Sequence, residues 1–498
     1  MYLLGVDVGT SVIKAALFDA EGQELVSCRQ STQVLQSRSG WMEADMLATW
    51  HTCCDVMRAV LNSSEGRGRE VAAVGVTGNM IGAWLIDAEG EPVRNAILWC
   101  DSRTQALWSQ LTAQQPDLAA RIFAMDGCVV ESGATLLVLR WLQEHEPQAL
   151  QRARWVFSSK DWIVYQLSGV AQIDSSEAAV LPGDTRTQQS PEMLWEWFGI
   201  QAQRRLLPPV QPSDRVIGRL QPQAAALIGL KAGTPLVAGA GDVPCNALGL
   251  GATEADTAFM VLGTNLQVCR VFEQPMFEPP LVGLLFYQPH KRWFRALMNV
   301  AGTTNLDWAI RQFYAELGAA KAAERFKRIE AEASRRSIGA DGVIYLPYLS
   351  RAGLIAPFVA PAARAQFVGL HDGHTRADLL RAVYEGVALA ARDCYSALGE
   401  LPAQVIFAGG GARSAFWSQL MADCLGATVV VPQGHEFGAK GAALLAGVGV
   451  GMFSDIQTAS RSAFRPARIY TPDREAHAHY TALYARYRAV QQSAQALW

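Results

Sequence analysis

The sequence lacks the cysteine patterns that indicate a disulfide framework or a structural zinc site. Its nine cysteines are scattered between Cys28 and Cys424, and they form no Cys-x-x-Cys pair and no group with nearby histidines. An odd number of unpatterned cysteines favours buried thiols in a reducing compartment over cross-links or metal ligands.

The chain also lacks an excess of basic residues, an apolar run long enough to cross a membrane, and a signal-peptide pattern. Lys and Arg number 43 against 46 Asp and Glu, which gives a net charge of −3 and a pI near 6.3. Nucleic-acid-binding proteins usually run basic, and a membrane-spanning helix needs roughly 18 or more apolar residues. We therefore expect a soluble, cytoplasmic protein that binds a small molecule and contacts neither nucleic acid nor membrane.

The residues that are present suffice for several hydrophobic cores. Half of the 498 residues are hydrophobic, and a length of about 150 residues per domain predicts two to four domains. Residues 45–61 place apolar side chains along one helical face, and residues 71–77 are typical of a buried strand. Helices that alternate with strands in this way favour an α/β sheet.

An acid interrupts the apolar strand that opens the chain. Asp7 lies within the run of residues 2–8, and Thr10 and Ser11 follow in a tight turn. A buried carboxylate costs several kcal/mol unless it is paired, and the N–H groups and hydroxyls of such a turn can hold an anion. The pattern predicts a hairpin that binds a metal-bound polyphosphate, but a polar turn with a partly exposed aspartate explains the segment alone equally well.

A loop after the strand at 71–77 carries the first candidate pocket residues. Asn79, Met80 and Ile81 stand directly after the carboxyl end of that strand, where ligands of α/β sheets gather. An ordinary turn between two strands is the slightly favoured alternative when the segment is considered alone.

The segment 97–104 runs from a strand into a helix and holds a second group of candidates. Trp99 and Arg103 can wall a sugar pocket, or they can simply pack and pair. Asp101 is explained at least as well by a cap that accepts hydrogen bonds from the first turn of the helix.

A second isolated acid follows a buried strand later in the chain. Residues 235–241 are apolar and end on two glycines, and Asp242 precedes a helix of small residues at 245–251. Asp242 occupies the place of a catalytic acid or base, or it caps that helix. A second acid at a strand end favours the chemical role.

Residues 257–268 repeat the form of the opening hairpin. Gly263-Thr264 takes the place of Gly9-Thr10 between two apolar strands, with no partner for Asp7. The repeat predicts two related halves, each presenting a phosphate-binding hairpin to a cleft between them.

Two further turns in the second half suit a nucleotide. Residues 301–305 place hydroxyl and amide side chains at a helix start, which is both a capping signal and a site that favours anions. Residues 409–411 are three successive glycines that let a flat ring lie on the backbone, although such turns are also common without a ligand. The polar segment 174–177 is interpreted as a loop without an assigned role.

Taken in order, these motifs resemble those of the FGGY carbohydrate kinases, and within that family those of the pentulose kinases. The match spans nearly the whole chain, through residues 7–14, 77–82, 98–103, 239–242, 262–264, 301–304, 346–349, 367–370, 409–414 and 438–443. The resemblance implies an α/β protein with the two-domain actin-like ATPase fold, which is ribonuclease H-like, and an ATP cleft between the domains. It divides the chain into an N-terminal FGGY domain at 1–243 and a C-terminal FGGY domain at 244–498.

The resemblance also implies the roles of individual residues. Asp242 matches the family's general base, and Asp7 and Asp242 match its magnesium site. The residues implied for ATP are Thr10, Ser11 and Lys14 in the first hairpin, Gly263 and Thr264 in the second, Gly302 and Thr303, and Gly410, Gly411 and Ser414 around the adenosine. The residues implied for the sugar are Asn79, Met80, Ile81, Trp99, Asp101, Arg103 and Asp242. The implied cofactors are ATP and Mg²⁺, and the resemblance allows a homodimer.

Two segments depart from the family pattern. Residues 79–82 read Asn-Met-Ile-Gly where D-xylulose kinases of this family typically carry Gln-Met-His-Gly, so the imidazole beside the sugar is missing. Residues 350–354 read Ser-Arg-Ala-Gly-Leu where many members carry Gly-Glu-Arg-Thr-Pro. We expect a kinase that phosphorylates a terminal hydroxyl of a ketopentose such as xylulose. The alternatives are a kinase of glycerol, erythritol or a sugar acid, and a nucleotide-switched ATPase without sugar kinase activity.

Overall fold

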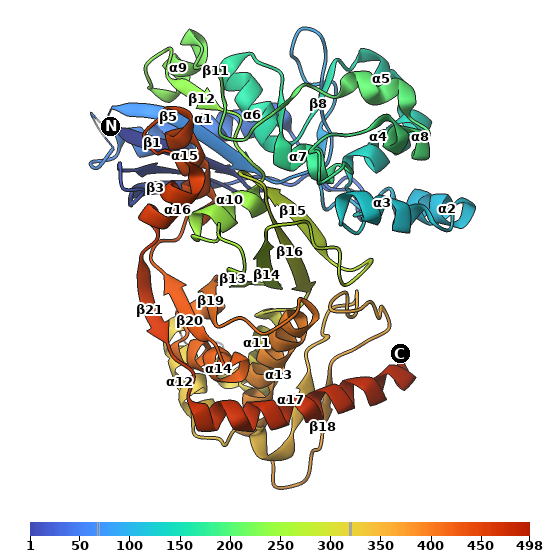
Figure 1. Ribbon diagram of the computed structural model, residues 1–498, viewed down its shortest axis with the longest axis vertical. Coiled ribbons are helices and arrows are strands. Elements are labelled where there is room, and N and C mark those ends of the chain that lie inside the picture. Colours follow the sequence, from blue (N-terminus) through green and yellow to red (C-terminus); the bar gives the residue numbers. More distant parts are fainter. Residues whose placement is uncertain (67, 69, 318–320) are drawn as a thin grey trace.

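The computed structural model describes residues 1–66, 68, 70–317 and 321–498, and it has two lobes, each built around a mixed sheet (Figure 1). Within the described residues, the six-stranded sheet has the order β11-β12-β5-β1-β2-β3 and the seven-stranded sheet the order β15-β16-β14-β13-β19-β20-β21. Each sheet has its own apolar core, one containing Trp84 and Trp162 and the other Tyr345 and Trp417.

The first half of the chain contributes the strands β1 (Tyr2–Val8), β2 (Val12–Phe18), β3 (Glu24–Ser31), β4 (Glu43–Ala44), β5 (Val71–Gly78), β6 (Trp84–Ile86), β7 (Ala96–Ile97), β8 (Trp155–Phe157), β9 (Ile173–Asp174), β10 (Val210–Gln211), β11 (Val216–Arg219) and β12 (Pro235–Val237). Its helices are α1 (Met46–Asn62), α2 (Gln105–Gln114), α3 (Leu118–Asp126), α4 (Thr135–His145), α5 (Pro147–Arg152), α6 (Ser159–Ser168), α7 (Ser175–Val180), α8 (Glu192–Trp197), α9 (Pro222–Ile228) and α10 (Asp242–Gly249).

The second half contributes the strands β13 (Ala258–Leu262), β14 (Leu266–Phe272), β15 (Leu284–Gln288), β16 (Arg292–Asn299), β17 (Ile344–Leu346), β18 (Gln366–Val368), β19 (Gln404–Ala408), β20 (Thr428–Pro432) and β21 (Pro466–Tyr470). Its helices are α11 (Thr304–Phe313), α12 (Ala322–Ser334), α13 (Arg376–Ala397), α14 (Ala415–Leu425), α15 (Phe437–Gly449), α16 (Ile456–Ala463) and α17 (Arg474–Ala494).

The two sheets share one structural unit at their centres. β1 forms an antiparallel hairpin with β2 and pairs in parallel with β5. In the same way, β13 forms a hairpin with β14 and pairs in parallel with β19. The two related halves that the sequence predicts are therefore present, and each hairpin turn lies at one end of its sheet's central strands.

Helix α15 comes from the second half of the chain but packs against β1 and β5 of the first sheet (Figure 1). A Cβ on Gly5 would lie 1.9 Å from the Ala439 carbonyl oxygen, and one on Gly75 would lie 1.9 Å from that of Ala442. Because only glycine permits this approach, larger residues at either position would force the helix off the sheet.

The segment 174–177 is not the loop that the sequence predicted. Asp174 ends β9 and caps α7 by accepting hydrogen bonds from the N–H groups of Ser176 and Glu177. Lys160 of α6 is fully buried and lies 2.9 Å from the Asp174 carboxylate. The polar residues of this segment therefore belong to a buried ionic network.

The division at residues 243 and 244 stays a prediction, and it falls within the first turn of α10. None of the helices in the described parts of the chain is both long and apolar enough to cross a membrane.

Candidate active site

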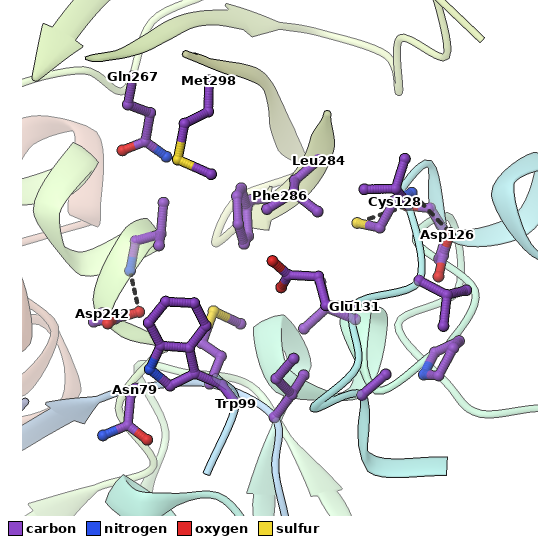
Figure 2. Close-up of a pocket in the computed structure, with 18 residues that line it drawn as sticks. Asn79, Trp99, Asp126, Cys128, Glu131, Asp242, Gln267, Leu284, Phe286 and Met298 are labelled. Carbon is purple, nitrogen blue, oxygen red and sulfur yellow. Dashed lines mark hydrogen bonds between the residues drawn. The ribbon is translucent and has the colours of Figure 1, made fainter. Parts of the chain in front are cut away.

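A small cavity lies between loops of the first half and strands of the second sheet (Figure 2). Its volume is about 170 Å³, below the roughly 300–1,000 Å³ of drug-sized sites, so it suits a small ligand. The first half lines it with Asn79, Met80, Ile81, Trp99, Asp126, Cys128, Val129, Val130, Glu131, Ala134, Val180, Pro182, Asp242 and Val243. The second half lines it with Gln267, Leu284, Phe286 and Met298.

Asp242 is the first residue of α10, and Gly241 is the N-cap. The capping alternative for Asp242 is therefore wrong. Its carboxylate accepts hydrogen bonds from the adjacent N–H of Val243, at 2.8 Å, and from its own backbone N–H. Burial, reinforced by the Asp7 carboxylate, raises the pKa of Asp242 to about 7. A carboxylate with a pKa near neutrality is suited to act as a general base.

Asp7 lies in β1 opposite Lys14 of β2. Burial raises the pKa of Asp7 to about 6, with Lys14 opposing the shift and Glu436 adding to it. Lys14 Nζ pairs with Glu436 Oε2 at 3.0 Å, and a Cβ on Gly438 would lie 3.0 Å from Asp7 Oδ2. The first turn of α15 thus closes over the acid, and glycine there leaves its carboxylate room.

The turn of the first hairpin is joined to the cavity wall by Trp99. The indole Nε1 of Trp99 donates a hydrogen bond to Thr10 Oγ1 at 2.9 Å. Ser11, beside Thr10, is exposed. Trp99 therefore connects the predicted sugar-binding wall with the predicted phosphate-binding turn.

Replacing Trp99 with phenylalanine removes this hydrogen bond and keeps an aromatic ring in the wall. We expect kcat/KM for both the acceptor and ATP to fall about 2- to 10-fold, the equivalent of about 0.5–1.5 kcal/mol for one hydrogen bond. Steady-state kinetics with each substrate varied in turn measure the effect. The control is Trp155→Phe in β8, away from the cavity, and equal losses in the two variants would contradict the connection.

The second hairpin is fixed to the start of α11. Gly302 N–H donates to the Thr264 carbonyl at 2.7 Å, and Thr303 N–H donates to the Gly263 carbonyl at 2.8 Å. A Cβ on Gly302 would lie 2.5 Å from the carbonyl carbon of Asn265. The structure therefore brings these four predicted residues together where the hairpin turn meets the start of α11.

A larger cavity of about 720 Å³ lies between the start of α11 and the glycine-rich segment. Its lining residues include Thr303, Gly410, Gly411 and Ser414. Ser414 caps α14 by accepting a hydrogen bond from the Trp417 N–H at 2.9 Å. The residues predicted for adenosine thus share one cavity. Another cavity, of about 520 Å³, includes both Lys14 and Gly410.

Asp101 and Arg103 are not among the residues that line the small cavity, and their predicted role in sugar binding stays a prediction. The Arg103 side chain is fully buried and donates to Asp101 Oδ2 at 2.8 Å and to Glu43 Oε1 at 2.7 Å. Asp101 also accepts from the Met42 N–H at 2.6 Å, and it does not cap α2, whose N-cap is Thr104. These contacts hold the loop that carries Trp99. The charge of Arg103 is already balanced by Asp101 and Glu43 within the chain.

Sequence reasoning missed the groups that hold the cavity wall in place. Ile81 has a left-handed backbone with φ of 53°, and its N–H donates to Glu177 Oε1 at 2.8 Å. The Gly241 N–H, next to Asp242, donates to Ser176 Oγ at 3.0 Å. The four consecutive polar residues at 174–177 were the available signal, but nothing in the sequence pairs them with these loops.

The cavity also contains Glu131, which no motif identified. It lies in the connection between α3 and α4, and burial raises the pKa of its carboxyl to about 7.

Two hairpin-bearing sheets with a cleft between them form the two-domain actin-like ATPase fold, as the sequence predicted. The solved structure of a xylulose kinase from Rhodospirillum rubrum matches this chain with a TM-score of 0.89 and 26% identity, covering 100% of this chain and 99% of that one. The agreement extends over both lobes, so the fold class is confirmed.

Family models identify the chain more closely. The N-terminal domain of the FGGY family of carbohydrate kinases matches residues 2–249, and the C-terminal domain matches residues 258–450. The L-xylulose/3-keto-L-gulonate kinase of Escherichia coli K12 is 32% identical over 98% of this chain and 96% of its own length. The erythritol kinase of Brucella abortus is 30% identical over 100% of this chain and 97% of its own. The chain belongs to the FGGY family of carbohydrate kinases, and it is an ATP-dependent sugar or polyol kinase.

Proposed function

We propose that the protein transfers the γ-phosphoryl group of ATP to a terminal hydroxyl of a small ketopentose or polyol. The observation that carries this proposal is the position of Asp242, a carboxylate with a raised pKa at the wall of a small cavity. The cavity lies beside the hairpin turn that holds Thr10. The acceptor hydroxyl in the cavity and the γ-phosphate of ATP at the hairpin turn would meet where the cavity adjoins that turn.

Asp242 accepts the proton of the acceptor hydroxyl while that oxygen attacks the γ-phosphorus. The new O–P bond forms, the bond between the γ-phosphorus and the bridging oxygen breaks, and ADP leaves with the bond electrons. Phosphoryl transfer requires mainly an aligned nucleophile and neutralised phosphate charge. The backbone N–H groups and hydroxyls at 10–11 and 263–264 would supply part of that neutralisation.

The acids of the site suit a magnesium ion. Asp7 and Asp242 offer carboxylate oxygens, the ligands that Mg²⁺ prefers, and neither forms an ion pair with a cation among the described residues. Lys14, the basic residue opposite Asp7, pairs with Glu436 instead. When bound, Mg²⁺ neutralises charge on the β- and γ-phosphates.

The apolar wall at Ile81 supports an acceptor other than D-xylulose itself. Ile81 lines the cavity where D-xylulose kinases of the family typically place a histidine. The relatives include kinases of L-xylulose, 3-keto-L-gulonate and erythritol, and we propose that the acceptor is of this size. A nucleotide-switched ATPase is the second candidate function, but such a protein has no use for a base beside a separate small cavity.

We expect ATP hydrolysis to be slow when no acceptor is present and ADP release to be fast when one is. Water is a poor phosphoryl acceptor because, unlike the sugar or polyol, it neither fills the cavity nor promotes closure of the cleft. A phosphate-release assay without acceptor and an ADP-release assay with acceptor measure the two rates. Rapid phosphate release that no acceptor accelerates would favour the switch.

A further inference from the structure

Glu131 is a carboxylate in the cavity that forms no contact accounting for its charge. Figure 2 shows its oxygens pointing toward the middle of the cavity, between Phe286 and Trp99. Its main-chain carbonyl accepts a hydrogen bond from the Ala134 N–H at 2.9 Å. No described residue donates a hydrogen bond to its carboxylate or forms an ion pair with it. Glu131 is only partly buried, so its carboxylate oxygens are free to accept hydrogen bonds from a ligand in the cavity.

The charge of the cavity lining restricts what that partner can be. Asp126, Glu131 and Asp242 all line the cavity, and no Lys, Arg or His does so among the described residues. Asp126 is already engaged, because its Oδ1 accepts from the Cys128 N–H at 2.8 Å. Glu131 and Asp242 are close enough to affect each other, since the charge of Glu131 contributes to the raised pKa of Asp242. A ligand carboxylate here would meet two acids without a compensating cation.

We propose that Glu131 accepts a hydrogen bond from an acceptor hydroxyl remote from the reacting one and excludes acceptors that carry a carboxylate. The cavity then takes neutral polyols and ketoses and rejects sugar acids. This inference rests on the proposed function, because it assumes that Asp242 marks the reacting end. Hydroxyl groups satisfy Glu131 by donation, whereas a second carboxylate would only repel it.

The alternative is a carboxylate that only helps to shape the connection between α3 and α4. The backbone hydrogen bond to Ala134 already holds that turn, and substitution of the side chain would leave that bond in place. A structural role therefore predicts altered stability but an unchanged preference between neutral and acidic acceptors.

The test pairs each neutral acceptor with the acid formed by oxidising its C1: L-xylulose with L-threo-2-pentulosonate and erythritol with D-erythronate. We expect the wild-type protein to favour the neutral member by at least about 100-fold in kcat/KM. Glu131→Gln keeps the size of the side chain and removes its charge. It should lower kcat/KM for the neutral acceptor about 10- to 100-fold, mainly through KM, because a hydrogen bond to a charged group is lost. Its preference for the neutral member should fall at least about tenfold.

Two further variants distinguish an effect of the charge at position 131 from an effect on the folding of the protein. Glu131→Asp keeps the charge and should still reject the acids, even if the shorter side chain weakens binding of the neutral acceptor. Glu144→Gln changes an acid on the outer face of α4 that pairs with Arg140, and it should leave kcat/KM unchanged. Thermal melting and ATP binding of each variant report whether the fold is retained.

The outcomes distinguish this inference from the proposed function. Wild-type kcat/KM for the acids within tenfold of that for the neutral acceptors would overturn the role of Glu131 alone, as would an unchanged preference in a folded Glu131→Gln protein. Failure of every acceptor, neutral or acidic, would overturn the proposed function and this inference with it.

Discussion

Replacing Asp242 with asparagine is expected to lower kcat for sugar phosphorylation by about 10²- to 10⁴-fold, the usual contribution of a general base. Asparagine cannot take the proton of the acceptor hydroxyl. It keeps the Oδ1 atom that accepts the Val243 N–H, so the start of α10 should remain folded. ADP release in a coupled assay measures the loss.

Binding of ATP should survive this substitution, because the predicted adenosine cavity involves Thr303 and Gly410 rather than α10. Calorimetric titration with ATP tests that expectation. The matched control is Asp117→Asn, which changes an exposed acid on the surface that pairs with Arg121, and it should retain full activity. Full activity in the Asp242→Asn protein would remove Asp242 from the mechanism.

Replacing Lys160 with methionine is expected to destabilise the protein by about 3–5 kcal/mol, the usual result of removing one partner from a buried ion pair. The Lys160 side chain is fully buried between the carboxylates of Asp161 and Asp174. Burial opposes its charge, but the surrounding carboxylates, including that of Glu177, hold the pKa of Lys160 above its ordinary value. Without the ammonium group, these acids would remain buried and uncompensated.

The consequence should reach the active site. Glu177 holds the Ile81 N–H, and Ser176 holds the Gly241 N–H beside Asp242. We therefore expect Lys160→Met to lower the melting temperature by several degrees and to lower activity at temperatures where the protein is still folded. Differential scanning calorimetry and kinetics at low temperature measure both. The control is Lys231→Met, at an exposed position. An equal melting temperature in the two variants would show that the buried ionic network does not stabilise the protein.

The sequence predicted the two hairpins because strand pairing and glycine turns leave local patterns. Gly9-Thr10 and Gly263-Thr264 stand between apolar runs, and the structure places both pairs in equivalent turns. Asp242 was predictable for the same reason, since an isolated acid directly after a buried strand is unusual. The metal, nucleotide and sugar roles of these residues stay predictions.

The interactions that the sequence did not reveal join distant segments. Arg103 pairs with Glu43, which lies 60 positions away, so its burial could not be inferred from residues 97–104. Glu131 lines the cavity from the connection between α3 and α4, and Glu177 of α7 accepts the Ile81 N–H from behind the cavity wall. Neither belongs to a local motif. The sequence alone therefore could not predict where a charged residue lies when its partner is remote in the chain.

The most direct test of the central claim is ADP release by the wild-type protein across a panel of ketopentoses, ketohexoses, polyols and sugar acids, with mass spectrometry of the products. We predict that at least one neutral ketopentose or polyol accelerates ADP release far above the rate without acceptor and gains one phosphoryl group. If no compound in the panel accelerates ADP release, the protein does not act as the sugar kinase proposed here.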